Sequence, residues 1–446
     1  MSAVVRLSDH RFLQHALDAA AASGGGDVVV PAGVHRTGPL TLGSNVTLTL
    51  EKDAVLLFDD DSMRYEPVWT RWEGVECWAM RPLLYAADAD NVTIRGEGVI
   101  DGNGRRWWGR FRQNESSNQQ EPVHPDELRL AALNRDYRSR PGGGARPQTQ
   151  YLRPPLVQAW RCRNVTIEGV TLRNSPFWTL HTVYSSDVRI SGVTITNPPD
   201  AINTDAIDID SCQRVLVEDC LLDVGDDGVT LKSGSGPDGV RVGVPTCDVL
   251  VRGCTVLASH GGIAIGSETA GGIHRVTVEN CRFVGTQRGV RLKTRRTRAG
   301  TVRDLTFRNL EMLRVWCPIV IGMYFQPGVD PDDPQYASVM SQLPQPVTEH
   351  TPQIHGVHIA GVRATEVRST AAFIVGLPEA PITDVTIEHF TYSVAADEDL
   401  LPTWNSEWTG GLFHDDSRGV KVINAHATFD SPSTNGPSCG PPNRRR

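Results

Sequence analysis

The stretch Asn164-Val-Thr-Ile-Glu-Gly-Val-Thr-Leu172 decides the fold, because close copies of it recur along the chain. The best copies follow at intervals of 23, 27, 34, 27 and 29 residues and begin at Asp187, Arg214, Asp248, Arg275 and Asp304. Fainter copies begin near residues 45, 91, 356, 384 and 419. A near-constant unit with insertions of variable length is typical of a solenoid whose loops vary on one side.

Positions 2, 4, 7 and 9 of each copy are apolar, and position 6 of the strong copies is Gly, Asp or Asn. This alternation predicts two short strands separated by a turn, since Gly, Asn and Asp tolerate the left-handed backbone of a sharp bend. Such short strands bury a face only by stacking coil upon coil. We therefore predict an all-β chain that forms a single parallel β-helix. Cys220, Cys254 and Cys281 share position 7 and are expected to form a small apolar stack inside it.

The solenoid is predicted to span residues 1–430 as one catalytic domain with covered ends. Residues 8–22 have the pattern of an amphipathic capping helix that stops at the glycines from Gly24. Residues 104–155 contain no repeat unit and are expected to form an insertion that walls a groove. The segment 431–446, rich in Pro, Gly and Asn and ending in three arginines, is expected to be disordered.

Composition excludes several classes of protein. The 446 residues carry a formal net charge of −8, which argues against a nucleic-acid or anionic-membrane partner. No apolar run is long enough to span a bilayer. We see no secretory signal, and the nine cysteines show no disulfide or zinc pattern, so we expect a cytoplasmic location, or a secreted one if a signal has been removed. The sequence leaves the oligomeric state open.

Three acids and one histidine are expected on the same face of adjacent coils. Asp205 aligns with Asp227, which follows 22 residues and one coil later. Neighbouring parallel strands lie about 4.8 Å apart, so the two carboxylates should be neighbours. Asp226 aligns with His260 on the next coil. Like charges at this spacing repel each other, which favours a functional over a purely structural origin for the set.

Crowded carboxylates suit acid–base chemistry. One acid stays protonated while the others remain ionised, so one can protonate a leaving glycosidic oxygen and another can activate a water. This predicts glycoside hydrolysis, with inversion if the acid and base lie roughly 6.5–9.5 Å apart, and it requires neither a metal nor a cofactor. Two further acids of the same strand, Asp208 and Asp210, are assigned to structure.

Six basic residues between positions 288 and 298 indicate an anionic substrate. Arg291 and Lys293 are expected beside the acids, where a guanidinium and an ammonium would bind a uronate carboxylate. The remaining run, Arg295, Arg296 and Arg298, is expected to form a solvated face or loop.

The sequence resembles glycoside hydrolase family 28, the polygalacturonases and their relatives, whose fold is a right-handed parallel β-helix. The motifs that carry the resemblance occur in the family's order and read Asn203-Thr-Asp205, Gly225-Asp226-Asp227, Ser259-His260-Gly261 and Arg291-Leu-Lys293. Two longer stretches, 174–181 and 260–268 taken with 288–296, are similar to the bacterial exo-acting branch. Ala206 and Gly228 stand where the family usually has Gly and Cys, and these small changes affect packing more than chemistry.

The resemblance implies roles for single residues. It makes Asp227 the general acid, while Asp205 and Asp226 hold and activate water and His260 tunes the acid or binds sugar. Arg291 and Lys293 would hold the galacturonate carboxylate. Further substrate-binding candidates are Asn203, Lys232 and His181, with Trp178 either lining the site or packing in the core. The implied activity is the hydrolysis of α-1,4-galacturonosidic bonds, with release of galacturonate from the non-reducing end and an acidic, galacturonate-containing saccharide as partner.

Three alternatives remain at this stage. The enzyme could hydrolyse a related pectin such as rhamnogalacturonan or xylogalacturonan. A β-helical pectate lyase would instead use Ca²⁺ and an arginine base for elimination. A non-catalytic carbohydrate-binding β-helix would need no paired Asp226 and Asp227 beside His260.

Overall fold

The repeat unit folds as two short strands separated by a left-handed turn, as predicted. In the copy at residues 164–172, strands β13 (Arg163–Glu168) and β14 (Thr171–Arg173) flank Gly169, whose φ is 74°. The same position has a positive φ in the other strong copies, at Gly192, Asp219, Gly253, Asn280 and Asn309. The computed structural model describes residues 4–6, 12–138, 147–329, 331–403, 412–413, 418–430 and 433–434.

The first residue of each copy also has a left-handed backbone, which the sequence pattern did not indicate. Arg214 and Arg275 adopt a φ of 55°, although arginine has no intrinsic preference for this region. Each pairs with the aspartate at the same position of the preceding coil: Arg214 Nε lies 2.7 Å from Asp187 Oδ1, and Arg275 Nε lies 2.7 Å from Asp248 Oδ1. These exposed pairs line up along the outside of the solenoid.

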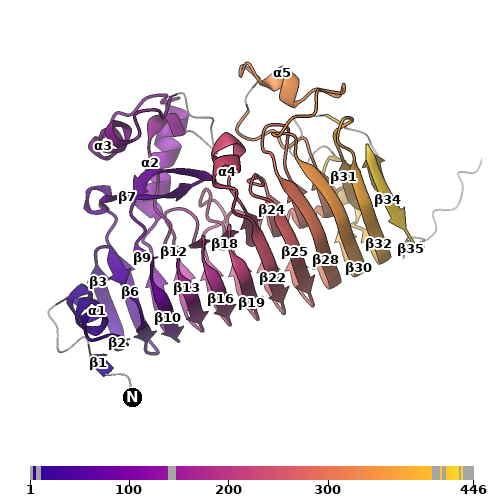
Figure 1. Ribbon diagram of the computed structural model, residues 1–446. Helices are drawn as coiled ribbons and strands as arrows, with labels where there is room; N and C mark the ends of the chain where they lie inside the picture. Colours follow the sequence, from indigo (N-terminus) through magenta and orange to yellow (C-terminus); the bar gives the residue numbers. More distant parts are fainter. Residues whose placement is uncertain are drawn as a thin grey trace, which may run out of the picture.

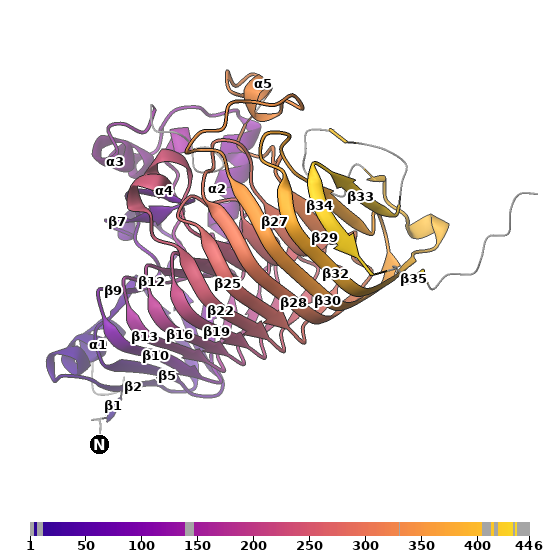
Figure 2. The ribbon, with the colours of Figure 1, turned by 45° about the vertical axis from the view of Figure 1, so that its right-hand side comes forward.

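Stacked coils form a right-handed parallel β-helix, in which each strand pairs with its counterpart one coil away (Figure 1). Val165 pairs with Val188, and Val188 pairs with Val215, so the same apolar position repeats in register. Figure 2 shows the strands of successive coils lying side by side along the solenoid.

One parallel sheet holds eleven strands of the described chain, and it carries the residues of interest. Its strands are β4 (Leu40–Leu42), β9 (Leu84–Ala87), β12 (Val157–Trp160), β15 (Leu180–Val183), β18 (Ile207–Asp210), β21 (Val229–Lys232), β24 (Gly261–Gly266), β27 (Arg288–Lys293), β29 (Cys317–Gly322), β31 (Ala372–Val375) and β33 (Val420–Ile423).

The other parallel sheet contains the repeat units themselves. The strands before the turn are β1 (Val4–Arg6), β2 (Gly26–Val30), β5 (Val46–Leu50), β10 (Asp90–Gly96), β13, β16 (Ser186–Ser191), β19 (Gln213–Glu218), β22 (Thr246–Arg252) and β25 (Ile273–Glu279). The strands after the turn are β3 (Gly33–Thr37), β6 (Ala54–Phe58), β11 (Val99–Asp101), β14, β17 (Thr194–Thr196), β20 (Leu221–Asp223), β23 (Thr255–Leu257) and β26 (Arg282–Val284). In three later coils the strands before and after the turn form one long strand: β28 (Thr301–Leu313), β30 (Gln353–Val367) and β32 (Ile382–Val394). The sheet ends with the separate strands β34 (Ala425–Phe429) and β35 (Ser433–Thr434), which both pair with β32.

Apolar side chains from every coil fill the interior. Val165 and Ile167 before the turn and Val170 and Leu172 after it are all buried, as their alternation predicts. The predicted stack of Cys220, Cys254 and Cys281 is also buried, and these thiols are free. Burial of such continuous apolar rows is what stabilises a stacked solenoid.

Helices cover one end and one side of the solenoid (Figure 1). Helix α1 (Leu13–Ala22) packs Leu13, Ala16, Leu17 and Ala20 against the first coils, within the predicted cap. Residues 8–11 of that prediction lie outside the described residues, as does the predicted tail 431–446 apart from the backbone of β35. No helix in the described ranges is long and apolar enough to cross a membrane.

Loops on one side rise above the coils. The predicted insertion contributes α2 (Arg105–Ser116), α3 (Pro125–Leu133) and a short turn at Pro147–Thr149. An antiparallel hairpin, β7 (Pro67–Trp72) and β8 (Val75–Met80), lies beside them together with α4 (Gly236–Val242). Helix α5 (Tyr336–Val339) lies on the same side, above the later coils. Two further short turns span Ser62–Arg64 and Asp397–Asp399.

Candidate active site

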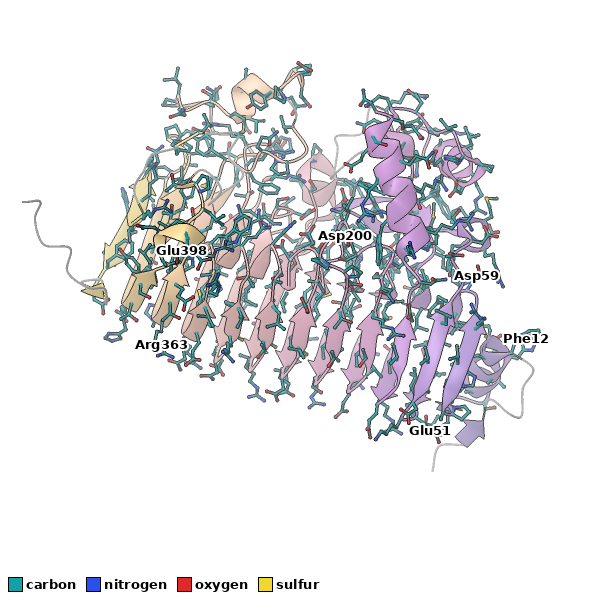
Figure 3. The ribbon with its side chains drawn as sticks, turned by 180° about the vertical axis from the view of Figure 1, so that it is seen from behind. Phe12, Glu51, Asp59, Asp200, Arg363 and Glu398 are labelled. Atoms are coloured by element: carbon teal, nitrogen blue, oxygen red, sulfur yellow. The ribbon has the colours of Figure 1, made fainter. Side chains whose placement is uncertain are left out.

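A pocket of about 470 Å³ lies between these loops and the eleven-stranded sheet. Its walls come from the hairpin tip, from helix α2, from residues 325–328 and from the loops that precede β18, β21 and β24. Asp200, which lines the pocket, pairs with Arg112 of α2 at 2.7 Å, and Figure 3 shows it near the base of that helix. The lining residues that the following argument uses are Glu73, Asn203, Asp205, Asp226, Lys232, His260, Glu268, Arg291, Lys293 and Arg298.

The three acids expected to converge do so. The amide N–H of Ala206 donates to the carbonyl oxygen of Asp227 at 2.9 Å, which continues the pairing of β18 with β21 and sets Asp205 beside Asp227. One carboxylate oxygen from each of Asp205, Asp226 and Asp227 lies within 4.8 Å of the others. The coil register therefore concentrates three negative groups at one point.

His260 lies against Asp226 from the following coil, as the alignment predicts. Its Nδ1 is 3.2 Å from Asp226 Oδ1, and its backbone N–H donates to the Asp226 carbonyl at 3.0 Å. The two side chains are 25% and 18% exposed. A hydrogen bond between a ring nitrogen and a carboxylate oxygen holds one proton between the two groups.

Arg291 and Lys293 both reach Asp227. Lys293 Nζ is 2.7 Å from Asp227 Oδ2, and Arg291 Nη1 is 3.3 Å from Asp227 Oδ1. They cross an intervening coil, where Gly261 leaves the necessary space: a Cβ at Gly261 would lie 2.8 Å from Asp227 Oδ1 and 3.5 Å from Arg291 Cδ. The cations therefore cover Asp227, whose side chain has 0% exposure.

The three carboxyls have different proton affinities. Burial, followed by the charges of Asp226 and Asp208, raises the pKa of Asp205 well above its ordinary value. Burial would also raise the pKa of Asp226, but the adjacent His260 outweighs it and lowers that pKa. For Asp227 the opposing effect of burial is overcome by Lys293 and Arg291, which hold its pKa well below the usual range. A cluster of this kind retains one proton where isolated aspartates would retain none.

These surroundings do not fit Asp227 as the proton donor, the role that the family resemblance implied for it. Both of its oxygens contact cations, it has no exposed surface, and it does not line the pocket. Asp205 and Asp226 both line the pocket, and Asp226 is the more exposed of the two. Asp205 and Asp226 are therefore the two acids of the cluster that face the pocket.

Lys232 and Asn203 line the pocket, as expected of substrate-binding candidates. Lys232 Nζ lies 3.8 Å from Asp205 Oδ2, 3.5 Å from Glu268 Oε2 and 4.4 Å from the centre of the Trp178 ring. Asn203 Oδ1 accepts a hydrogen bond from Arg153 at 2.7 Å, which fixes its amide. Trp178 lines the pocket as well.

His181 was expected to bind substrate, but it does not line the pocket. Its side chain is 1% exposed. It stands edge-on to Trp178, with 4.9 Å between the ring centres, and hydrogen-bonds to Gln158 at 2.9 Å. Because β15 turns this side chain beneath the pocket floor, its role is to support Trp178. The two acids assigned to structure, Asp208 and Asp210, are likewise buried and do not line the pocket.

The run of Arg295, Arg296 and Arg298 is not solvated, contrary to expectation. All three side chains are buried, because the loops that follow β21, β29 and β31 pack against them. Arg295 donates to the carbonyl of Pro327 at 2.6 Å, and Arg296 pairs with Glu379 at 2.6 Å. Arg298 lines the pocket. The run thus anchors the loops that wall the site.

Sequence interpretation missed the hairpin and its tip residue Glu73. The segment Trp72-Glu-Gly-Val75 carried a usable signal, since Gly at a two-residue turn between aromatic and β-branched residues indicates a hairpin. It also missed Glu268 and Arg298 as lining residues.

Among the described residues, Asp205, Asp226 and Asp227 are the group of acids close enough together to hold a metal ion. Lys293 and Arg291, however, already neutralise the charge of Asp227 from within the protein.

Comparisons with known proteins agree with this geometry. The family model described as glycosyl hydrolases family 28 matches residues 140–391, which include all four motifs. The chain belongs to glycosyl hydrolase family 28. It is therefore a glycoside hydrolase, and the coils that carry the acids lie inside the matched region.

Individual members of family 28 resemble the chain over most of its length. A probable polygalacturonase from Vitis vinifera is 31% identical over 85% of this chain and 69% of its own length. An endo-polygalacturonase from Pectobacterium carotovorum is 26% identical over 69% of each chain. The solved structure of a hyperthermoactive exopolygalacturonase from Thermotoga maritima is 30% identical, with a TM-score of 0.77 over 97% of this chain and 92% of that one.

Proposed function

We propose that the protein hydrolyses the α-1,4-galacturonosidic bonds of polygalacturonate or oligogalacturonides and releases galacturonate from the non-reducing end. Membership of family 28 supports the hydrolysis of pectic chains. The observation that supports exo action is the wall that the hairpin tip forms in the pocket beside the acids. Relatives with both endo and exo activities resemble the chain, so the choice between them rests on this pocket.

The hairpin tip ends the pocket a short way from the acids. Lys232 contacts Asp205 on one side and Glu268 on the other, at 3.8 and 3.5 Å. Gly74, at the tip, packs directly on Glu268, because a Cβ there would lie 2.7 Å from Glu268 Cγ. One layer of side chains thus separates the acids from the end wall. A long chain cannot continue past that wall, whereas a terminal sugar can enter.

In the proposed mechanism, Asp226 protonates the leaving oxygen, because it faces the pocket. Asp205 is protonated in the free enzyme, since its pKa is raised, and passes that proton to Asp226. Asp205 and Asp227 then orient the attacking water, and the ionised Asp205 accepts the proton that the water loses. Direct attack by water inverts the anomeric configuration, so an α-linked substrate gives β-galacturonate.

The substrate carboxylate binds Arg291 and Lys293 in this proposal. Both cations line the pocket and are held in place by Asp227 and by the ring of Phe325, which lies 5.4 Å from Arg291 and 5.2 Å from Lys293. A uronate offers two oxygens that match a guanidinium. Because the incoming carboxylate competes with Asp227 for these cations, its binding would free Asp227 to hold the water.

The test is time-resolved sizing of the products from polygalacturonate. Galacturonate monomer as the first product supports the proposal, whereas a ladder of oligomers at early times would refute exo action. A lyase would give unsaturated, ultraviolet-absorbing products and would lose activity with a chelator. Parallel assays on rhamnogalacturonan and xylogalacturonan separate the related pectins.

We also propose a cytoplasmic location, supported by the eight cysteines of the described residues, which are all free and buried. In that case short oligogalacturonides would be the substrates met in the cell. Fractionation of the native host tests this, since recovery of the enzyme from the medium would contradict it.

A further inference from the structure

The tip of the hairpin places one acid at the end wall of the pocket. Glu73 and Gly74 form the two-residue turn between β7 and β8, with φ values of 44° and 81°. Two successive positive φ values are typical of the type I′ turn, whose backbone matches the twist of a hairpin. Glutamate is rarely found at such a position, which costs it backbone strain.

The hairpin is fixed on three sides, so Glu73 is held rigidly. The backbone N–H of Ser235 donates to the Gly74 carbonyl at 2.9 Å. Arg71, just before the tip, pairs with the buried Asp210 at 2.7 Å. The Trp72 ring stacks on Phe177, with 5.2 Å between centres and 13° between planes. A rigid support of this kind is what a specific binding group requires.

Glu73 lines the pocket while being 5% exposed. Its Oε2 has no hydrogen-bond partner among the described residues, although a buried carboxyl oxygen normally has one. The charged groups that face it are Glu268 after β24, Arg153 before β12, Lys232 on β21 and Arg298 after β27. Burial, followed by the charge of Glu268, raises the pKa of Glu73 to about 8. The side chain is therefore a neutral acid at pH 7, able both to donate and to accept a hydrogen bond.

The chemistry of a 1,4-linked chain indicates what this group would meet. In every internal sugar, O4 belongs to a glycosidic bond, and only the sugar at the non-reducing end has a free 4-hydroxyl. That hydroxyl points away from the scissile bond, toward the end wall. A buried polar group without a partner discriminates strongly against ligands that leave it unpaired.

We propose that Glu73 is a specificity-determining residue that hydrogen-bonds the free 4-hydroxyl of the terminal galacturonate. The inference rests on the proposed exo function and adds to it the group that recognises the chain end. A neutral Glu73 also does not repel the negatively charged carboxylate of the substrate. Once Glu73 ionises, the pocket end carries one more negative charge and binds the uronate less well.

The experiment compares two trisaccharides. One is trigalacturonate, and the other carries a 4,5-unsaturated uronate at its non-reducing end and so lacks the 4-hydroxyl. The measured quantity is the ratio of kcat/KM for the two substrates in the wild type, in Glu73→Ala and in Glu73→Gln. A difference between ratios cancels the effect of the altered ring shape itself. Glu115→Gln, which changes a pocket-lining acid on α2, is the matched control.

We expect the wild type to prefer the saturated substrate and Glu73→Ala to lose about 10-fold of that preference, the size of one good hydrogen bond. Glu73→Gln keeps a hydrogen-bonding group and should retain most of the preference, as should Glu115→Gln. If Glu73→Ala keeps the wild-type ratio, or if Glu115→Gln lowers it equally, the proposal is wrong. Release of monomer from polygalacturonate together with an unchanged ratio would refute Glu73 alone, whereas early oligomers would refute the exo function as well.

A pH series provides a second readout that does not depend on the alanine variant folding. As pH rises through about 8, wild-type Glu73 loses its proton, whereas the side-chain amide of the Glu73→Gln variant does not titrate. The kcat/KM of Glu73→Gln relative to wild type on trigalacturonate should therefore increase across this range. A ratio that stays flat with pH would contradict the role of the neutral acid.

Discussion

Asp226 and Asp227 are adjacent in sequence but have different surroundings. Asp226 faces the pocket and contacts His260, whereas Asp227 lies beneath Lys293 and Arg291. Sequence reasoning found all of these residues, because the coil register that aligns them is visible as a repeat. It did not distinguish the roles of the two acids, since those depend on which carboxyl the cations cover.

The His260 side chain controls the proton affinity of Asp226. Replacing it in His260→Gln removes the group that lowers the pKa of Asp226, so burial should then raise that pKa. A proton donor is active only while it holds its proton, so its ionisation sets the basic limb of the profile of kcat/KM against pH. We expect that basic limb to move to higher pH in His260→Gln. A basic limb that keeps its wild-type position would show that Asp226 is not the group that titrates there.

Arg291 should act mainly in binding. In Arg291→Ala, loss of one charged contact to the uronate is expected to raise KM for trigalacturonate by about 10-fold or more, with a smaller change in kcat. The substrate methyl-esterified on the contacted sugar should be much less sensitive to the change. The control is Arg308→Ala, which changes an exposed arginine on strand β28 of the sheet that contains the repeat units. Equal effects on the free acid and the ester would exclude a role in binding the carboxylate.

Strands and loops were predicted with unequal success. The repeating strands follow from alternation, and the turns follow from Gly, Asp and Asn at position 6. The hairpin β7–β8 occurs once and has no copy to reveal it, and Arg296 and Arg298 are buried by loops distant in sequence. Contacts of that kind depend on the tertiary structure, which a local charge pattern does not encode.

The hairpin tip tolerates no side chain at Gly74. Its φ is 81°, and a Cβ would lie 2.7 Å from Glu268 Cγ and 2.8 Å from Ser235 Cβ. Gly74→Ala should therefore lower the free energy of unfolding by roughly 1–3 kcal/mol and raise KM, as strain and crowding displace the tip. Gly109 of α2 has nothing within 4 Å of a Cβ, so Gly109→Ala should be neutral or stabilising by up to about 1 kcal/mol. Denaturant unfolding of both variants checks this, and equal stabilities would contradict the docking described for the tip.

The molecule as a whole combines a rigid solenoid with loops gathered on one side. The coils bring together acids that are separated in sequence, while the hairpin, α2 and the loops after β29 enclose the space above them. A solenoid without those loops would present an open groove. The coils therefore hold the hydrolytic site, and the loops determine which part of a substrate chain can reach it.

The central claim is that the cluster of Asp205, Asp226 and Asp227 performs the hydrolysis, with Asp226 as the proton donor. The most direct test is the kcat of Asp226→Asn on trigalacturonate, with circular dichroism to verify the fold and the exposed Asp223→Asn as control. We predict a loss of about 10²–10⁴-fold for Asp226→Asn, the usual contribution of a positioned acid, and little change for the control. Turnover near the wild-type rate in a folded Asp226→Asn protein would contradict the account.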